Sequence, residues 1–226
     1  MSRHDKQPRY CALFDLDGVI VDTRAAIREA LRALACEAGV AIDPDVLDAT
    51  VLLSPVDALR VLGVSDAHRV YNCDYDEALS LAIGEVRVFD EVVSGMATLA
   101  KSGIGLGIVT AQARSRLRYL VPPEVMDLVA VVIAHEDAPA KPAPDGILAA
   151  CAHLRVPPER TFFIGDRTTD VMAGRAAGVI TVGASWGMAG AAALRREGVD
   201  VLIAAPDQVG PVVLAQIDSR GGLADR

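Results

Sequence analysis

Two pairs of aspartates follow short apolar runs of the chain, and they are the residues best suited to chemistry. Asp15 and Asp17 come directly after the first apolar run, and Asp166 and Asp170 follow a later one. Single aspartates often cap loops, but four carboxylates at one place repel one another unless a cation compensates their charge. Oxygen ligands of this kind suit Mg²⁺, which keeps several waters and binds through a few carboxylates and phosphate oxygens. The pattern therefore predicts a magnesium site.

Two further polar residues follow apolar runs in the same way. Thr110 ends one such run, where its hydroxyl and the next backbone N–H can hold a phosphate oxygen. Lys141 lies in a loop with prolines at 139, 142 and 144, which restrict the backbone and so limit where the ammonium group points. Each residue alone is weak evidence, because most loop lysines are surface residues. In this order with the aspartates, they indicate a phosphate site.

Short apolar segments alternate with amphipathic segments along most of the chain, which predicts the elements that must position these residues. Strands that are apolar throughout and separated by helices indicate an α/β fold with a parallel sheet covered on both faces. Open parallel sheets place their sites beyond the carboxyl ends of the strands. The expected strands are 10–14, 104–109, 129–134, 161–164, 179–182 and 200–203, and the expected helices between them are 95–101, 114–120, 145–154 and 170–177.

Residues 22–90 have a different character, with helical patterns and no convincing strand. Thr23 is the expected N-cap of a helix that runs through residue 38, and further helices are expected at 45–50, 56–62 and 67–83. An all-helical insert after the first strand suggests a lid over the strand ends. We therefore expect a catalytic α/β core from residues 1–21 and 91–226, and a helical cap domain at 22–90.

Composition excludes several classes of protein. The chain has 226 residues, 52% hydrophobic and 23% charged, so it can bury a core and is not disordered. With 22 basic and 30 acidic residues, and no basic run, it does not resemble a nucleic-acid binder. The longest uncharged stretch, 176–194, contains four glycines and predicts strand, loop and helix start, not a membrane span.

The expected compartment is the cytoplasm. The first ten residues are polar and show no secretion signal. The four cysteines lie far apart, at spacings that form neither a zinc site nor a disulfide framework. The sequence does not predict an oligomeric state.

Four motifs stand in a fixed order in the sequence: DLDGV at 15–19, IVT at 108–110, KPAPDG at 141–146 and GDRTTD at 165–170. In this order they resemble the haloacid dehalogenase superfamily of phosphotransferases. The resemblance spans residues 10 to about 206, and the helical insert resembles the small cap of the phosphoglycolate phosphatase-like branch. It implies a Rossmann-like core with an inserted helical cap.

The same resemblance implies a Mg²⁺-dependent phosphatase acting on a small phosphorylated metabolite through an aspartyl-phosphate. Asp15 would attack phosphorus, and Asp17 would protonate the leaving oxygen and then activate water. Asp15, Asp166 and the backbone carbonyl of Asp17 would hold the metal. Asp170 would not bind the metal itself but would orient Lys141 or the water molecules bound to the metal.

The resemblance also implies how the phosphate is held. Thr110 and Lys141, with the backbone N–H groups of Leu16 and Ala111, would bind the phosphate oxygens, where transition-state charge collects. Relatives often carry serine or asparagine where this chain has Ala111, and Gln112 is the candidate to replace that side chain. Dehalogenases of this fold lack an acid at the place of Asp17 and attack carbon without a metal, so Asp17 favours phosphorus chemistry.

Two alternatives remain at this point. A phosphomutase of the β-phosphoglucomutase type would keep the same core and return the phosphate to a bound sugar phosphate. A catalytically silent binding module is less favoured, because such a module is expected to have lost a nucleophile or metal ligand, and all of them are present. Phosphoglycolate, sugar phosphates, nucleotides and biosynthetic intermediates are all open as substrates.

Overall fold

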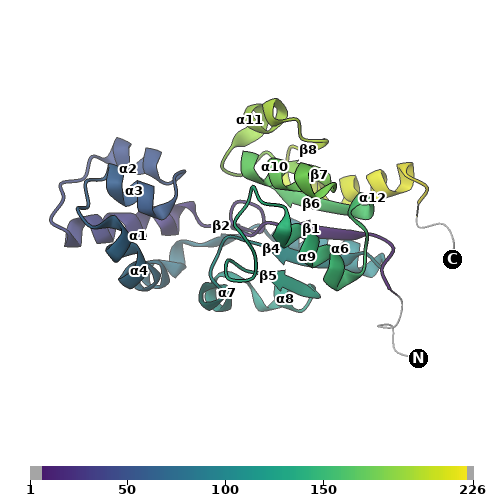
Figure 1. The fold of residues 1–226 in the computed structure, drawn as a ribbon, viewed down its shortest axis with the longest axis horizontal. Coiled ribbons are helices and arrows are strands. Elements are labelled where there is room, and N and C mark those ends of the chain that lie inside the picture. Colours follow the sequence, from purple (N-terminus) through teal and green to yellow (C-terminus); the bar gives the residue numbers. More distant parts are fainter. Residues whose placement is uncertain (1–6, 223–226) are drawn as a thin grey trace. The chain divides into compact units, whose positions relative to one another are not determined.

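The computed structural model describes residues 7–222 (Figure 1). The chain divides into two compact units. The larger unit consists of the chain up to Val21, Val88–Leu117 and the chain from Val121 onward, and the smaller consists of Asp22–Arg87 with Arg118–Leu120. Among the helices of residues 7–222, none has the length and apolar character that crossing a membrane requires.

The larger unit is built on six parallel strands, which confirms the predicted fold class. In the sheet their order is β5-β4-β1-β6-β7-β8, so the chain starts at the centre, builds one half of the sheet, then crosses β1 to build the other half. Such a reversal creates a switch point, where doubly wound folds place their sites. The strands are β1 (Cys11–Phe14), β4 (Gly105–Val109), β5 (Val131–Ile133), β6 (Thr161–Gly165), β7 (Ile180–Ala184) and β8 (Val201–Ile203).

The register of the central strands aligns their carboxyl ends. Phe14, the last residue of β1, pairs with Ile108 of β4 and with Ile164 of β6. The backbone N–H of Asp15 then donates a hydrogen bond to the carbonyl of Ile164 at 2.8 Å. The residues that follow these three strands therefore meet at one edge of the sheet.

Helices cover both faces of this sheet (Figure 1). Alternating residues of β1, Cys11 and Leu13, pack with Ile147 and Ala173 of two helices in one apolar cluster, as the period of a strand requires. The helices of the larger unit are α6 (Asp90–Lys101), α7 (Arg114–Leu120, whose last three residues group with the smaller unit), α8 (Pro123–Met126), α9 (Asp145–Leu154), α10 (Thr168–Ala177), α11 (Gly190–Glu197) and α12 (Val209–Ser219), and short 3₁₀ turns lie at Pro158–Arg160 and Pro206–Gln208.

Three helices of this unit differ from expectation, and one of them, α8, was not predicted. α6 begins at Asp90, five residues before the predicted start, and has Asp90 and Glu91 in its first turn, where acidic side chains favour a helix. α12 was not predicted either, and its sequence includes Gly210 and Pro211, which both disfavour a helix interior. Both lie in its first turn, where proline is tolerated, and Gly210 packs backbone to backbone with Gly95 of α6.

The smaller unit is helical and has its own core. Leu31, Leu34, Leu47, Leu59 and Tyr75 are all buried in one apolar cluster. The helices are α1 (Arg24–Glu37), α2 (Pro44–Thr50), α3 (Pro55–Val61), α4 (Ala67–Cys73) and α5 (Tyr75–Leu81), followed by a 3₁₀ turn at Ile83–Glu85.

Two sequence-based expectations for this region are wrong. The single helix expected at 67–83 breaks at Asp74, whose φ of −120° leaves the helical range, and Tyr75 is then buried with its ring 5.3 Å from that of Tyr71. A two-stranded sheet, β2 (Val21–Asp22) and β3 (Arg87–Val88), pairs the two ends of the insert, where no strand was expected. Such short pairs carry no periodicity that a sequence reveals.

Candidate active site

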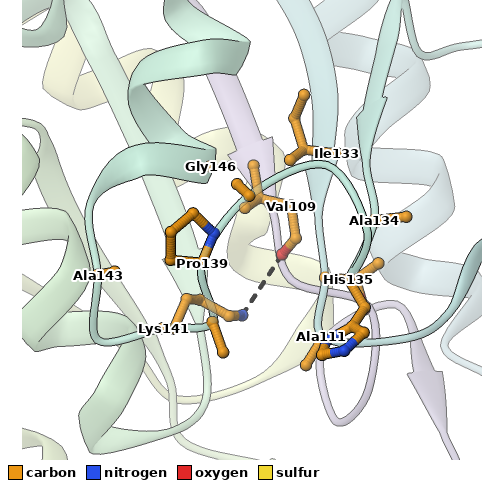
Figure 2. A pocket seen from close by; sticks show the side chains of 12 residues that line it. Val109, Ala111, Ile133, Ala134, His135, Pro139, Lys141, Ala143 and Gly146 are labelled. Atoms are coloured by element: carbon orange, nitrogen blue, oxygen red, sulfur yellow. Dashed lines mark hydrogen bonds between the residues drawn. The ribbon is translucent and has the colours of Figure 1, made fainter.

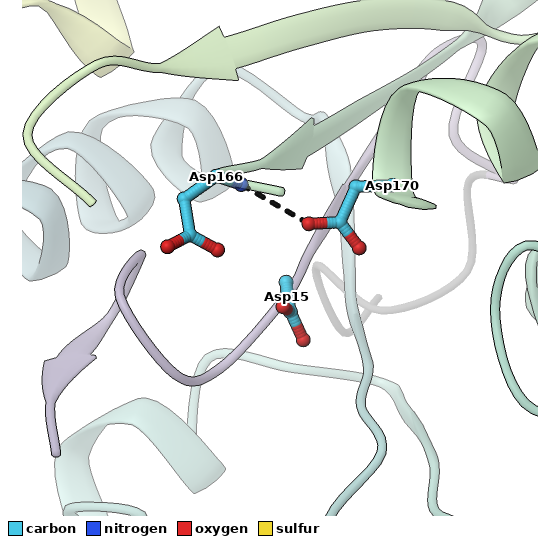
Figure 3. Close-up of side chains that lie close together, drawn as sticks. All are labelled: Asp15, Asp166 and Asp170. Atoms are coloured by element: carbon cyan, nitrogen blue, oxygen red, sulfur yellow. Dashed lines mark hydrogen bonds between the residues drawn. The ribbon is translucent and has the colours of Figure 1, made fainter. Parts of the chain in front are cut away.

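Three buried carboxyl groups meet at the carboxyl edge of the sheet. Asp15 directly follows β1, Asp166 directly follows β6, and Asp170 lies in the first turn of α10 (Figure 3). Each offers one oxygen atom within 4.8 Å of the others. The structure therefore brings together three of the four aspartates that the sequence singles out.

Lys141 is bound among these carboxylates. Its ammonium nitrogen lies 2.9 Å from Oδ1 of Asp15 and 2.6 Å from Oδ1 of Asp170, and its side chain is only 10% exposed. It also lies 3.4 Å from the carbonyl oxygen of Val109 (Figure 2). Thr110 and Ala111 line the same small pocket as Lys141. Three of the four residues expected to hold a phosphate thus line one pocket, which Leu16 does not line, and Lys141 is not a surface lysine.

Asp170 connects Lys141 to the backbone that follows β6. Its Oδ1 pairs with Lys141, while its Oδ2 accepts hydrogen bonds from the N–H groups of Asp166 and Arg167 at 3.1 and 2.9 Å. A side chain at Gly165 would place a Cβ 2.3 Å from Cβ of Asp170, so only glycine allows this approach. Both oxygens of Asp170 are therefore already bound by the protein.

Asp166 keeps one carboxylate oxygen without a partner. Its Oδ2 accepts a hydrogen bond from the N–H of Met188 at 2.6 Å, but no residue in 7–222 donates one to its buried Oδ1. The backbone at Gly18 and at Gly187 lies close to this carboxylate. A side chain at either position would place its Cβ only 2.1–2.3 Å from Oδ2, so glycine is required at both. Gly18 has a φ of +77°, and the chain just after Asp17 thereby reaches the Asp166 carboxylate.

The electrostatics of this cluster favour a bound cation. Burial raises the pKa of Asp15 to about 8, with Lys141 lowering it and Asp170, Asp166 and Asp17 raising it further. Burial, and then Asp170, raises the pKa of Asp166 to about 7. Burial alone would lower the pKa of Lys141, but its pairs with Asp15 and Asp170 outweigh burial and raise it. Negative charge exceeds positive charge here.

These residues fit a hard divalent cation. The buried, unpartnered Oδ1 of Asp166 is a ligand atom without another role, and the cluster of candidate ligands consists of carboxylates alone, with neither histidine nor cysteine. Oxygen-only sites suit Mg²⁺, Mn²⁺ or Ca²⁺ better than zinc or copper. Asp15 and Asp166 are the ligands that the geometry favours, because both oxygens of Asp170 are bound.

Asp17 has a partner that the sequence did not reveal. The side-chain amide of Gln112 donates a hydrogen bond to Oδ2 of Asp17 at 2.9 Å, and its backbone N–H donates to the hydroxyl of Thr110 at 3.1 Å. Arg116 in turn donates to the amide oxygen of Gln112 at 3.3 Å. Gln112 was expected near the phosphate, but a contact between residues 95 positions apart leaves no local signal.

Trp186 packs against Phe89, with the two rings edge to face and their centroids 6.3 Å apart. This contact gives Trp186 a packing role. It also immediately precedes Gly187 and Met188, the residues that close on Asp166.

A doubly wound sheet with buried carboxylates and a lysine at its switch point defines an α/β enzyme with a polar site at the strand ends. Residues 12–184 match the haloacid dehalogenase-like hydrolase family. The chain belongs to this family, which confirms the resemblance found in the motifs.

Known proteins similar to this chain include enzymes that act on phosphate compounds. Pyrophosphatase PpaX of Anoxybacillus flavithermus is 30% identical over 190 residues, which cover 79% of this chain and 84% of the relative. A predicted phosphoglycolate phosphatase from Haemophilus somnus 129PT superposes with a TM-score of 0.74 at 18% identity, covering 92% and 99% of the two chains. β-Phosphoglucomutase from Clostridium difficile gives a TM-score of 0.68 at 21% identity, covering 88% and 92%. At such identities the two structures show the common fold.

Proposed function

We propose that this protein is a Mg²⁺-dependent phosphatase that hydrolyses the phosphate monoester of a small metabolite through an aspartyl-phosphate. The observation that carries the proposal is the buried contact between Asp15 and Lys141, 2.9 Å apart, at the switch point of the sheet. The contact brings a carboxylate, the proposed nucleophile, beside a cation that can bind phosphate oxygens. Membership of a hydrolase family supports the same chemistry.

In the first step, a carboxylate oxygen of Asp15 attacks phosphorus. A bond forms between Asp15 and phosphorus as the bond between phosphorus and the leaving oxygen breaks. Asp17 acts as the acid and gives a proton to the leaving oxygen, so that an alcohol departs in place of an alkoxide.

In the second step, Asp17 acts as a base. Its carboxylate takes a proton from a water molecule as the water oxygen attacks phosphorus, and the bond between phosphorus and Asp15 breaks. Inorganic phosphate leaves, and Asp15 and Asp17 return to their starting states.

The charge of the transferring phosphoryl group is stabilised by fixed donors. Lys141, the hydroxyl of Thr110 and the backbone N–H groups of Leu16 and Ala111 would bind its oxygens. Asp170 keeps the ammonium group of Lys141 in place through the 2.6 Å ion pair. Thr110, Ala111 and Lys141 line one pocket, which supports their assignment to one phosphate site.

Mg²⁺ would be held by the side chains of Asp15 and Asp166 and by the backbone carbonyl of Asp17. When bound, the ion neutralises the excess negative charge of the carboxylates and of the phosphate. The raised pKa values of Asp15 and Asp166 mean that negative charge on these buried carboxyl groups is unfavourable without a cation beside them.

Binding of Mg²⁺ is expected to change the fluorescence of Trp186 and to raise Tm. Trp186 is the single tryptophan of the sequence and precedes the two residues that contact Asp166. A hundredfold excess over Kd stabilises a protein by about 2.7 kcal/mol, a rise of roughly 5–10 °C for a chain of this size. Asp166→Asn is expected to remove both responses.

Asp207→Asn is the matched control, because Asp207 is an exposed aspartate of the same unit. This variant should respond to Mg²⁺ as the wild type does. A wild-type protein with neither response, or an unchanged response in Asp166→Asn, would contradict the metal site.

The function is tested by phosphate release from a panel of small phosphate esters, with and without Mg²⁺. Inorganic pyrophosphate belongs in the panel because the PpaX relative carries that activity in its name. We expect Mg²⁺-dependent release, with the preferred compound identifying the substrate class. Transfer of phosphate between positions of a sugar phosphate without net release would favour a phosphomutase. Absence of both, together with no binding of Mg²⁺ and beryllofluoride, would indicate a silent binding module.

A further inference from the structure

The orientation of the Gln112 amide is determined by its two neighbours. A guanidinium group has donors and no acceptor, so the amide oxygen of Gln112 must face Arg116 and its NH₂ group must face Asp17. Arg116 is 7% exposed and lies on α7, one turn after Gln112. The amide therefore presents a donor to Asp17 and cannot turn over without losing the bond to Arg116.

The backbone of Gln112 is held on both sides. Its N–H donates to the hydroxyl of Thr110 at 3.1 Å, and its carbonyl oxygen accepts a hydrogen bond from the N–H of His135 at 3.0 Å. Gln112 is thus anchored to the residues that follow β4 and β5. A side chain fixed at its base and at its tip is suited to hold another residue in place.

We propose that Gln112, oriented by Arg116, positions the Asp17 carboxyl for proton transfer in both steps of the reaction. This inference rests on the proposed function, in which Asp17 is the acid and the base. The hydrogen bond from Gln112 to Oδ2 limits rotation of the Asp17 carboxyl group. Oδ2 therefore faces Gln112, and Oδ1 is the oxygen directed away from it. An amide is a good partner for this task, because it does not take up the proton that Asp17 must deliver.

The test is the Gln112→Met variant, which keeps the length of the side chain and removes its hydrogen bonds. kcat/KM reports the transfer of phosphate to Asp15, and this step needs an acid only when the leaving group is poor. We expect kcat/KM to fall about tenfold or more for an alkyl phosphate, and less than about threefold for p-nitrophenyl phosphate, whose leaving group needs no proton. The ratio between the two esters is the readout.

The same substitution at Gln216 is the matched control. Gln216 lies on α12, which packs against α6, and Gln216→Met should leave the ratio unchanged. The Trp186 response to Mg²⁺ in Gln112→Met should equal that of the wild type, which shows that the fold and the metal site are intact.

Two results would overturn the inference. Equal loss for both esters would mean that Gln112 binds the phosphate or supports the fold. A gain in activity would mean that Gln112 holds Asp17 away from the substrate. Failure of the proposed function itself gives a different result, because the wild type would then release no phosphate from either ester.

Arg116 provides a second, independent readout through a double-mutant cycle. If Arg116 acts through Gln112, Arg116→Met lowers kcat/KM for the alkyl ester in the wild-type background and has little further effect in Gln112→Met. Additive losses in the double variant would show that Arg116 does not act through Gln112. If Arg116→Met does not fold, Arg116→Lys, which keeps the charge without the planar fork, takes its place in the cycle.

Discussion

Asp15→Asn is expected to abolish phosphate release, by a factor on the order of 10⁴ or more, without unfolding the protein. An amide has no carboxylate oxygen to attack phosphorus, so the aspartyl-phosphate cannot form. The side chain keeps its shape, and Lys141 keeps its shorter ion pair with Asp170. Because burial raises the pKa of Asp15 to about 8, the metal-free protein gains little from a charge at this position. We therefore expect a Tm within a few degrees of the wild type.

The measurement is phosphate release together with capture of the covalent intermediate. Wild-type protein mixed with a labelled ester and quenched in acid should carry label that hydroxylamine removes, and Asp15→Asn should carry none. Asp17→Asn is the informative comparison, because it keeps the nucleophile but lacks the base, and so should retain label when supplied with p-nitrophenyl phosphate. Release by Asp15→Asn within a factor of ten of the wild type would remove Asp15 as the nucleophile.

Most of the sheet is predictable from the sequence because a buried parallel strand has a strong signature. Each strand of the sheet is a short apolar run closed by a polar or glycine-rich segment, and the expected strands agree with the observed ones to within two residues at either end. The same logic places Asp15 and Asp166 correctly at the strand ends. Lys141 is harder, since only the order of the motifs distinguishes it from a surface lysine.

The remaining features depend on contacts between distant parts of the chain. The break at Asp74 follows from the burial of Tyr75, which no periodicity within 67–83 encodes. The start of α12 depends on Gly210 packing against Gly95, more than a hundred residues away. The bond from Gln112 to Asp17 is of the same kind. Sequence patterns predict the candidate residues for chemistry, while the structure shows which residues contact them.

Lys141→Met is expected to reduce phosphate release about 10²- to 10³-fold, the usual cost of losing one donor to a developing oxyanion. The substitution also removes the ammonium partner of the buried Asp170 carboxylate, and breaking a buried ion pair typically costs 3–5 kcal/mol because an uncompensated charge remains. Asp15 and Asp170 would then face each other without the ammonium group between them. The metal-free variant is thus expected to be clearly less stable than the wild type.

Mg²⁺ should restore part of this lost stability, because the ion supplies positive charge to the same carboxylates. The rise in Tm on adding Mg²⁺ is therefore expected to be larger in Lys141→Met than in the wild type, while activity stays low because the ion does not replace the donor to the phosphate. Lys101→Met, at an exposed lysine that ends α6, is the matched control and should change neither quantity. An equal or smaller rise in Tm in Lys141→Met would show that Lys141 and the metal do not act on the same charges. Activity within about threefold of the wild type would remove Lys141 from the phosphate site.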